Sequence, residues 1–268
     1  MRRSALAIAL GCLVATAVPA LAGTALAPHR AVYDVTLDRA SDRSGIRDIK
    51  GRMVYEMTGS HCSGYAVRFR FFQNVKTARR EYTSDHRSTT FEDLGRGKFD
   101  FVTRSYFNGS LEREVKGSAE RKPEGVWVSL AKPGEKAVAL KDAVFTAQHM
   151  SDLIEAAKRG ETIVGRDVFD GSEDGDEVLA TTAVIGPRKE LDANEAEPLG
   201  KVGPHAWWPV SVSYFDLDDS AGEKLPVYQV SYAMHENGVS RRLKMRYADY
   251  ALDATLKDIE YLKVEACE

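Results

Sequence analysis

The chain has 268 residues, a formal net charge of −3 and 43% hydrophobic residues. A charge so close to neutral gives no reason to expect nucleic acid or an anionic membrane surface as a partner. Beyond the N-terminal segment, no run approaches the ~20 apolar residues that a membrane-spanning helix needs. All-β barrels and sandwiches reach this length as a single domain.

The N-terminal segment predicts a secretory signal peptide over residues 1–22. A basic pair, Arg2-Arg3, precedes an apolar run, and residues 20–22 (Ala-Leu-Ala) match a cleavage site. Cleavage there would leave residues 23–268 as one domain. Lipid attachment at Cys12 is a less favoured alternative, because the residues before it match a lipoprotein signal poorly.

Alternating apolar and polar residues predict strands through most of the first half of the chain. The first strand places Tyr33, Val35 and Leu37 on one face. Turn signals such as Asn108-Gly109 separate the later strands. The strands expected before the helix cover residues 31–38, 51–58, 65–76, 81–94, 99–107, 111–116, 125–130 and 137–140.

The clearest helical pattern lies over residues 146–159, and we expect the rest of the chain to be organised around this helix. Thr146 is expected to cap its start and Gly160 to end it in a left-handed conformation. An isolated helix of this length is marginal in water, so it needs a surface to pack on. Four apolar residues recur at helical spacing and share one face: Met150, Leu153, Ile154 and Ala157.

More strands follow the helix. Residues 163–169 and 178–185 predict a hairpin, and residues 187–204 a polar surface loop. So many strands around one helix favour an all-β fold, mainly antiparallel, in which a curled sheet or open barrel wraps around the helix. The remaining strands are expected at residues 210–215, 225–234, 241–250 and 256–264.

The acidic loop between residues 163–169 and 178–185 resembles the beginning of a calcium-binding loop. Asp170, Ser172 and Asp174 fall at loop positions 1, 3 and 5, but Thr181 stands where a bidentate glutamate is needed. A solvated hairpin tip is therefore favoured over a metal site.

Signal-peptide cleavage would leave two cysteines, Cys62 and Cys267. Secreted proteins meet oxidising conditions, so two cysteines indicate one disulfide, with two separate buried thiols as the alternative. Closing so long a loop would stabilise the fold by about 5 kcal/mol at most, from chain entropy.

The residues offer little support for catalysis. His149 lies on the expected helix three residues before Asp152, within side-chain reach, and a structural hydrogen bond is favoured over a role as a general base. The sequence has no G-x-S-x-G nucleophile elbow, no glycine-rich phosphate loop and no C-x-x-C motif. We therefore expect no catalytic residues, no metal and no cofactor.

Two aromatic stretches admit two interpretations. Core packing is the favoured one. The alternative is an apolar cleft that receives a lipid tail or a peptide, partly lined by the helix. The residues that would line such a cleft are Phe69, Phe71, Trp207, Trp208, Tyr214, Met150 and Leu153.

Several motifs, taken together, resemble the envelope integrity protein B family of alphaproteobacteria, and the resemblance covers nearly all of the chain after the signal peptide. They are HRAVYDVTL from His29, GRMVYEMTG from Gly51, TAQHM from Thr146, LIEAAKRGE from Leu153, VFDGSEDG from Val168, YFD from Tyr214, PVY from Pro226 and NGVS from Asn237.

The resemblance implies a β-spiral wound around the helix, similar in plan to lipoprotein-carrier proteins, with one disulfide between Cys62 and Cys267. Family members support cell-envelope integrity, and one is thought to act with a periplasmic tetratricopeptide-repeat protein. The family has no known catalytic residues or cofactors. We therefore expect a non-enzymatic periplasmic protein that acts through protein or lipid contacts. A carrier of an acyl chain or lipoprotein is the alternative, and an uncharacterised hydrolase is the second.

Overall fold

The computed structural model describes residues 24–191, 206–217, 225–265 and 267. The expected signal peptide over residues 1–22 and most of the polar loop expected over residues 187–204 lie outside these ranges. Within them, no helix is both long and apolar enough to cross a membrane.

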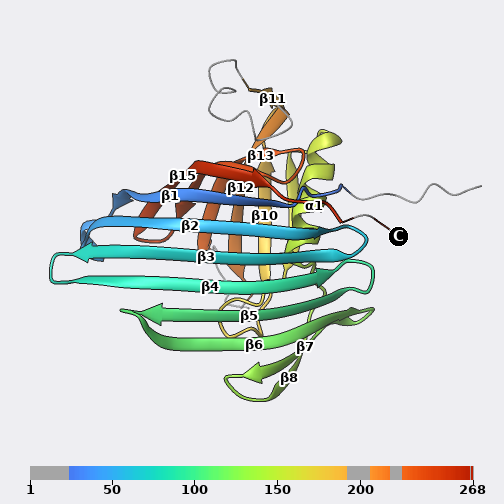
Figure 1. Ribbon diagram of the computed structural model, residues 1–268, viewed down its shortest axis with the longest axis horizontal. Coiled ribbons are helices and arrows are strands. Elements are labelled where there is room, and N and C mark those ends of the chain that lie inside the picture. The colour runs from blue at the N-terminus through green and yellow to red at the C-terminus, as the bar shows by residue number, and fades with distance from the viewer. Residues whose placement is uncertain (1–23, 192–205, 218–224, 266, 268) are drawn as a thin grey trace, which may run out of the picture.

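In the described part of the chain, fifteen strands form one sheet (Figure 1). The sheet order is β8-β7-β6-β5-β4-β3-β2-β1-β15-β14-β13-β12-β10-β9, with β11 paired to β12, so the first and last strands meet in the middle. All strand pairs are antiparallel.

The strands are β1 (His29–Ala40), β2 (Ile46–Ser60), β3 (Gly64–Thr77), β4 (Glu81–Asp93), β5 (Lys98–Phe107), β6 (Ser110–Lys122), β7 (Gly125–Lys132), β8 (Lys136–Leu140), β9 (Ile163–Val168), β10 (Leu179–Ile185), β11 (Lys189–Glu190), β12 (Ala206–Asp216), β13 (Tyr228–His235), β14 (Ser240–Arg246) and β15 (Tyr250–Tyr261). The helix α1 spans Thr146–Lys158, and a short 3-10 helix, η1, spans Asp42–Ser44.

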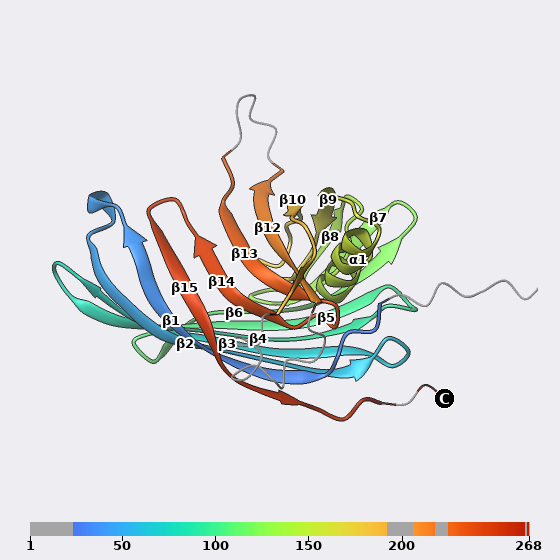
Figure 2. The ribbon, with the colours of Figure 1, turned by 90° about the horizontal axis from the view of Figure 1, so that it is seen from above.

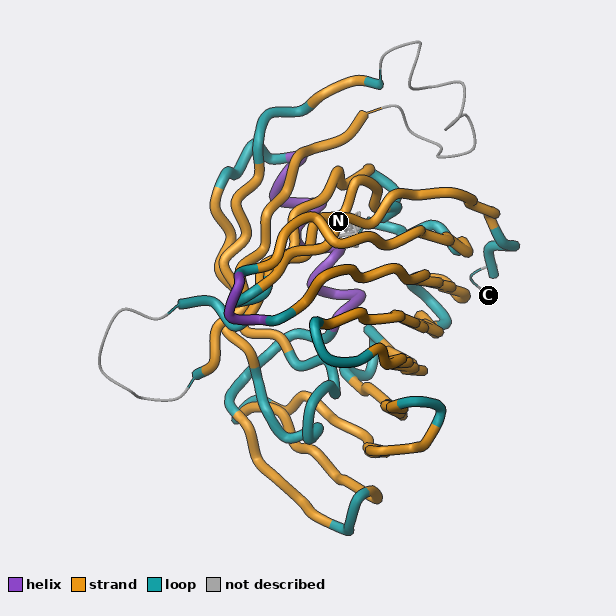
Figure 3. Tube along the Cα trace, turned by 90° about the vertical axis from the view of Figure 1, so that its left-hand side faces the viewer, coloured by secondary structure: helices purple, strands orange, loops and turns teal. Residues whose placement is uncertain are grey.

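The sheet curls strongly but does not close into a barrel, because in the described residues β8 and β9 end the strand order without pairing. The segment that leads from β8 into α1 crosses this seam. There Val144 donates to the carbonyl of Asp167 and accepts from Phe169, both at 2.9 Å. Figures 2 and 3 show α1 on the concave side of the curl. The predicted all-β fold, a curled sheet around one helix, is confirmed.

The helix is buried on more than one face because it lies inside the curl. Leu153, Ile154 and Ala157 of the predicted stripe are buried, while Met150 is only partly buried. Fully burying one Leu or Ile side chain contributes about 1.5–3 kcal/mol, so the helix depends on the surrounding strands. Buried residues outside the stripe are Ala147, His149, Ser151 and Ala156.

The predicted cap at Thr146 is wrong. Phe145 occupies the N-cap position, and no side-chain cap bond forms there among the described residues. Instead Glu92 of β4 accepts hydrogen bonds from the backbone N–H groups of Ala147, at 2.6 Å, and Gln148, at 3.0 Å. A carboxylate at this end also interacts favourably with the positive end of the helix dipole. At the other end, Gly160 adopts a φ of +77°, as predicted.

The hairpin of β9 and β10 is confirmed, but its acidic loop is not simply a solvated tip. Gly171 and Gly175 are buried, and a Cβ on Gly171 would lie 2.6 Å from Cγ of Phe101. Only glycine lets the loop pack this closely on the inner face of β5. Asp174 lies 3.5 Å from Arg113, and Asp170 accepts from the N–H of Ser172 at 2.8 Å, so both carboxylates have protein partners.

One predicted strand is divided in the structure. The segment over residues 241–250 ends at Arg246, and β15 begins at Tyr250. Between them, Tyr247 donates its N–H to the carbonyl of Tyr250 at 2.9 Å, which closes a tight turn. This turn contains no glycine or proline, so Asp249 is its one local turn signal.

Candidate functional site

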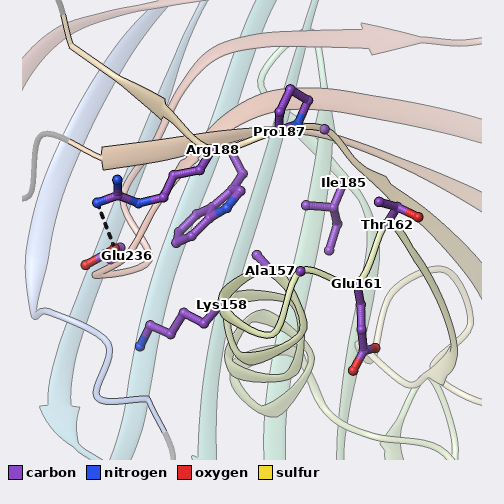
Figure 4. A pocket seen from close by; sticks show the side chains of 11 residues that line it. Ala157, Lys158, Glu161, Thr162, Ile185, Pro187, Arg188 and Glu236 are labelled. Carbon is purple, nitrogen blue, oxygen red and sulfur yellow. Dashed lines mark ion pairs between the residues drawn. The ribbon is translucent and has the colours of Figure 1, made fainter.

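A cavity of about 590 Å³ opens at the C-terminal end of α1 (Figure 4). Its walls come from the last turn of the helix, the turn into β9, the end of β10, the start of β12 and the turn between β13 and β14. We refer to it as the helix-end cavity.

Backbone hydrogen bonds hold the walls of the helix-end cavity in place. Glu161 donates its N–H to the carbonyl of Ala156 at 2.9 Å, just after the left-handed turn of the chain. Ile185 donates to the carbonyl of Thr162 at 2.8 Å, which ties the helix exit to β10. The cavity is therefore built from fixed main chain on two sides.

The floor of the helix-end cavity is apolar. Trp208 and Ile185 are each only 3% exposed, and Ala157 is 6% exposed. All three belong to the core cluster that also contains Leu153 and Ile154. The floor is thus the outer limit of the core around the helix.

The rim of the cavity carries charges of both signs. Arg188 pairs with Glu190 at 2.5 Å and lies 3.8 Å from Glu236, the contact drawn in Figure 4. Lys158 lies 3.6 Å from Glu155. These pairs are substantially exposed, and such pairs contribute about 0–1 kcal/mol each, so a ligand could exchange with them at little cost. An apolar floor under a charged rim suits an amphipathic ligand.

The structure brings together only some of the residues proposed to line a cleft. Trp208 forms part of the cavity floor. In the same core, Leu153 is buried, and Met150 and Tyr214 pack against it from partly buried positions.

The other three proposed residues lie elsewhere. Phe71 is buried in a separate cluster with residues of β1, β2 and β15, and Phe69 packs against that cluster. The ring of Trp207 instead lies 5.3 Å from the charged groups of both Lys189 and Arg241. The cleft-lining role stays a prediction for the whole set. Sequence alone does not single out Ile185, Arg188 or Glu236, since they come from two segments far apart in the chain, the end of β10 and the turn after β13.

His149 has the surroundings of a structural residue. Its Nε2 lies 3.4 Å from Oγ1 of Thr181, whose hydroxyl donates to the carbonyl of Arg166 at 2.8 Å. The predicted bond to Asp152 is not formed, because that carboxylate accepts from Gln148 at 2.7 Å and from Arg166 at 3.1 Å. Burial lowers the pKa of His149 to about 4, so the imidazole is neutral near pH 7.

Cys62 and Cys267 form a disulfide, with Cα atoms 5.6 Å apart and a sequence separation of 205. The bond joins the turn between β2 and β3 to the tail after β15. Both cysteines are exposed, so the alternative of two buried thiols is wrong. His61 Nε2 lies 3.3 Å from the sulfur of Cys62, but bonded sulfurs are not thiolate ligands for a metal.

These features define a class: a single β-spiral that encloses one helix and leaves a small amphipathic cavity at its end. The family model described as EipB-like matches residues 20–263. The chain is 38% identical over 247 residues to the cell envelope integrity protein EipB of Brucella abortus (strain 2308), covering 92% of this chain and 88% of that protein.

A solved structure is also similar. It is the crystal structure of a β-barrel-like protein of a domain of unknown function, DUF1849, from Brucella abortus. The TM-score is 0.84 at 37% identity, covering 89% of this chain and 99% of that chain. The chain therefore belongs to the EipB-like family.

Proposed function

We propose that this chain is a non-enzymatic periplasmic protein that supports the cell envelope by binding the acyl part of a lipid or lipidated protein in the helix-end cavity. The envelope role follows from membership of the EipB-like family and the name of its Brucella relative. The predicted signal peptide and the disulfide support a periplasmic location.

The observation that carries the ligand class is the apolar floor beneath the charged rim. The cavity volume of about 590 Å³ falls within the usual range for small-molecule sites. Each CH₂ group buried against Trp208 and Ile185 would contribute about 0.8 kcal/mol. The rim arginine and lysine, Arg188 and Lys158, are then available to a polar headgroup.

Packing around the helix limits how deep an acyl chain can go. Leu153 and Ile154 fill the space under the floor and are 1% and 0% exposed. A ligand would therefore lie on the floor rather than within the curl. This favours brief contact with one chain end over full enclosure of a lipid. A periplasmic tetratricopeptide-repeat protein is kept as the proposed protein partner.

The test compares two tryptophan variants of the mature protein. Thr162 is exposed at the cavity rim, so Thr162→Trp should fill the opening. Thr182 is exposed on β10 and does not line the cavity, so Thr182→Trp is the matched control. The probe is dodecanoyl lysophosphatidylethanolamine, followed by calorimetry below its micellar concentration.

The proposal expects binding by the parent protein and by Thr182→Trp, and binding weaker by at least about tenfold in Thr162→Trp, equivalent to about 1.4 kcal/mol. No binding by the parent, or equal binding by the two variants, would refute the cavity as the site.

A further inference from the structure

A second hollow lies on the outer face of the sheet. Two adjoining cavities of about 460 and 680 Å³ share Asp100, Lys116 and Gly117 in their walls. Together they form one groove across β2 to β8, the strands that lie side by side in Figure 1. We refer to it as the outer groove. None of its residues belongs to the helix-end cavity.

The strand register sets the direction of the outer groove. A row of directly opposed residues crosses seven neighbouring strands at right angles to them. With strands about 4.8 Å apart, this row is about 29 Å long. A groove of this length and direction fits a linear polymer. The row consists of Thr58, Ala66, Phe91, Asp100, Ser118, Ser129 and Ala137.

Phe91 presents an aromatic surface within this row. Its side chain is 38% exposed on the outer face, whereas the next residue, Glu92, points to the inner face and is buried. A Cβ on Gly64 would lie 2.8 Å from Cζ of Phe91, so the missing side chain makes room for the ring against the sheet. Ala66, directly opposite, adds little bulk. The ring is thereby held in place while part of it stays open to solvent.

The polar groups around the ring are free to bind a ligand. Four polar residues here are exposed and, among the described residues, take part in no side-chain hydrogen bond or ion pair: Asp100, Lys116, Ser118 and Ser129. They offer a carboxylate acceptor, an ammonium donor and two hydroxyls in one short stretch of the groove.

The same face is different further along the strands. There Asp85 accepts from Arg70 at 2.8 Å and from Arg87 at 2.7 Å, and Arg104 donates to Glu114 at 2.7 Å. These groups satisfy one another and fill the surface. The groups of this arginine-rich patch are therefore already paired, whereas the polar groups in the groove are open to a ligand.

The charge balance narrows the choice of polymer. The charged residues of the groove are three cations and three carboxylates, so it lacks the cationic excess that nucleic acid requires. A peptide cannot add a strand anywhere from β2 to β7, since each of these strands is paired on both sides. The charged residues are Arg68, Lys116, Lys136, Glu56, Asp100 and Glu135.

We propose that the outer groove binds a linear glycan. The apolar face of one sugar ring stacks on Phe91, and the hydroxyls of neighbouring sugars exchange hydrogen bonds with Asp100, Ser118 and Ser129. This site is separate from the helix-end cavity and goes beyond the function proposed for it.

The test uses calorimetric titration of the mature protein with N-acetylchitohexaose and, separately, with maltohexaose. Phe91→Ala should weaken binding by about tenfold, the size expected when one aromatic stacking contact is lost. The matched control is Phe72→Ala, since Phe72 is 36% exposed on the same face but lies among the paired arginines. Asp100→Asn should weaken binding less than Phe91→Ala does.

Two results would overturn the proposal: no binding of either hexasaccharide at millimolar concentration, or equal loss in the Phe91 and Phe72 variants. Circular dichroism confirms that each variant is folded. Thr162→Trp should retain full glycan binding, which separates failure of this site from failure of the helix-end cavity.

Discussion

The two ends of α1 are built in opposite ways. At its N-terminal end, the carboxylate of Glu92 is buried at 3% exposure, and the rings of Phe99 and Phe145 stack with centroids 5.0 Å apart. At its C-terminal end, the helix stops at the helix-end cavity, whose charged rim carries exposed ion pairs and a hydrogen bond from Lys158 to Thr24 at 3.1 Å.

Anchoring and ligand access are therefore assigned to opposite ends of one helix. Buried, hydrogen-bonded polar groups and aromatic packing fix the N-terminal end. Removing a partner of these buried groups would strongly destabilise the fold. Exposed pairs at the other end cost little to rearrange. A substitution at the N-terminal end should therefore change stability, and one at the C-terminal end should change binding.

The disulfide should have the largest effect on stability because it acts on the whole chain. Replacing Cys62 and Cys267 together by serine should lower the free energy of unfolding by at most about 5 kcal/mol, from the restored entropy of the unfolded chain. Denaturant unfolding measures it, with reductant added to the parent protein as the control. Equal denaturant-unfolding curves of the parent protein with and without reductant would contradict this expectation.

Phe99→Ala tests the aromatic packing at the N-terminal end. The ring is 0% exposed and contacts Phe101, Phe145 and Phe169. Its removal should cost about 3–5 kcal/mol, since the neighbouring rings cannot fill the space. Phe72→Ala, at an exposed position, should cost less than about 1 kcal/mol. Similar losses for the two variants would show that this end is not packed as described.

Glu92→Ala tests the polar anchor. The change leaves the N–H of Ala147, and in part that of Gln148, buried without an acceptor, which should cost about 2–3 kcal/mol. The control is Glu114→Ala, which breaks only an exposed pair with Arg104 and should cost less than about 1 kcal/mol. If Glu92→Ala lowered the free energy of unfolding no more than Glu114→Ala does, Glu92 would not anchor the helix.

Glu92 also predicts a pH dependence. Burial raises its pKa from the usual 4.5 to about 7, so the folded state favours the protonated acid. The contribution of protonated Glu92 to the free energy of unfolding is complete below about pH 4.5. It is lost as the pH rises through about 7. His149 acts in the opposite direction, because its pKa is lowered to about 4 and the unfolded state binds its proton more readily.

The measurable quantity is therefore the difference in unfolding free energy between the parent and Glu92→Gln. From about pH 5 to about pH 8 the parent should lose on the order of 2 kcal/mol relative to the variant, as the carboxylate ionises. A constant difference across this range would mean that Glu92 does not titrate near neutrality in the fold.

At the other end, Arg188→Ala should have the smallest effect on stability. The side chain is largely exposed and its pairs with Glu190 and Glu236 lie at the surface, so the loss should stay below about 1 kcal/mol. Lysolipid binding should nevertheless fall, because the rim loses one cation. If Arg188→Ala lowered stability but left lysolipid affinity unchanged, the C-terminal end would serve stability and not binding, which contradicts the expectation.

Much of the fold follows from local sequence patterns. Alternation predicts β4 and β5 to within about one residue, and helical periodicity with Gly160 predicts α1 and its end. Counting the cysteines outside the predicted signal peptide predicts the disulfide. Each of these features is set by residues close in sequence or by composition.

The features that sequence misses depend on distant residues. Glu92 is 55 residues from the N–H of Ala147, so Thr146 is the natural local candidate for a cap and is wrong. The hydrogen bond expected between His149 and Asp152 does not form, because Gln148 and Arg166 donate to the Asp152 carboxylate instead. The helix-end cavity gathers residues from several elements, so no single pattern marks it.

Amide hydrogen exchange with and without dodecanoyl lysophosphatidylethanolamine tests the central claim most directly. Bound probe should slow exchange at residues 157–162 and 185–188, which wall the open end of α1, and leave residues 145–149 unchanged. Slower exchange confined to residues 145–149, or no change at either end under saturating probe, would contradict the assignment of binding to the C-terminal end of the helix.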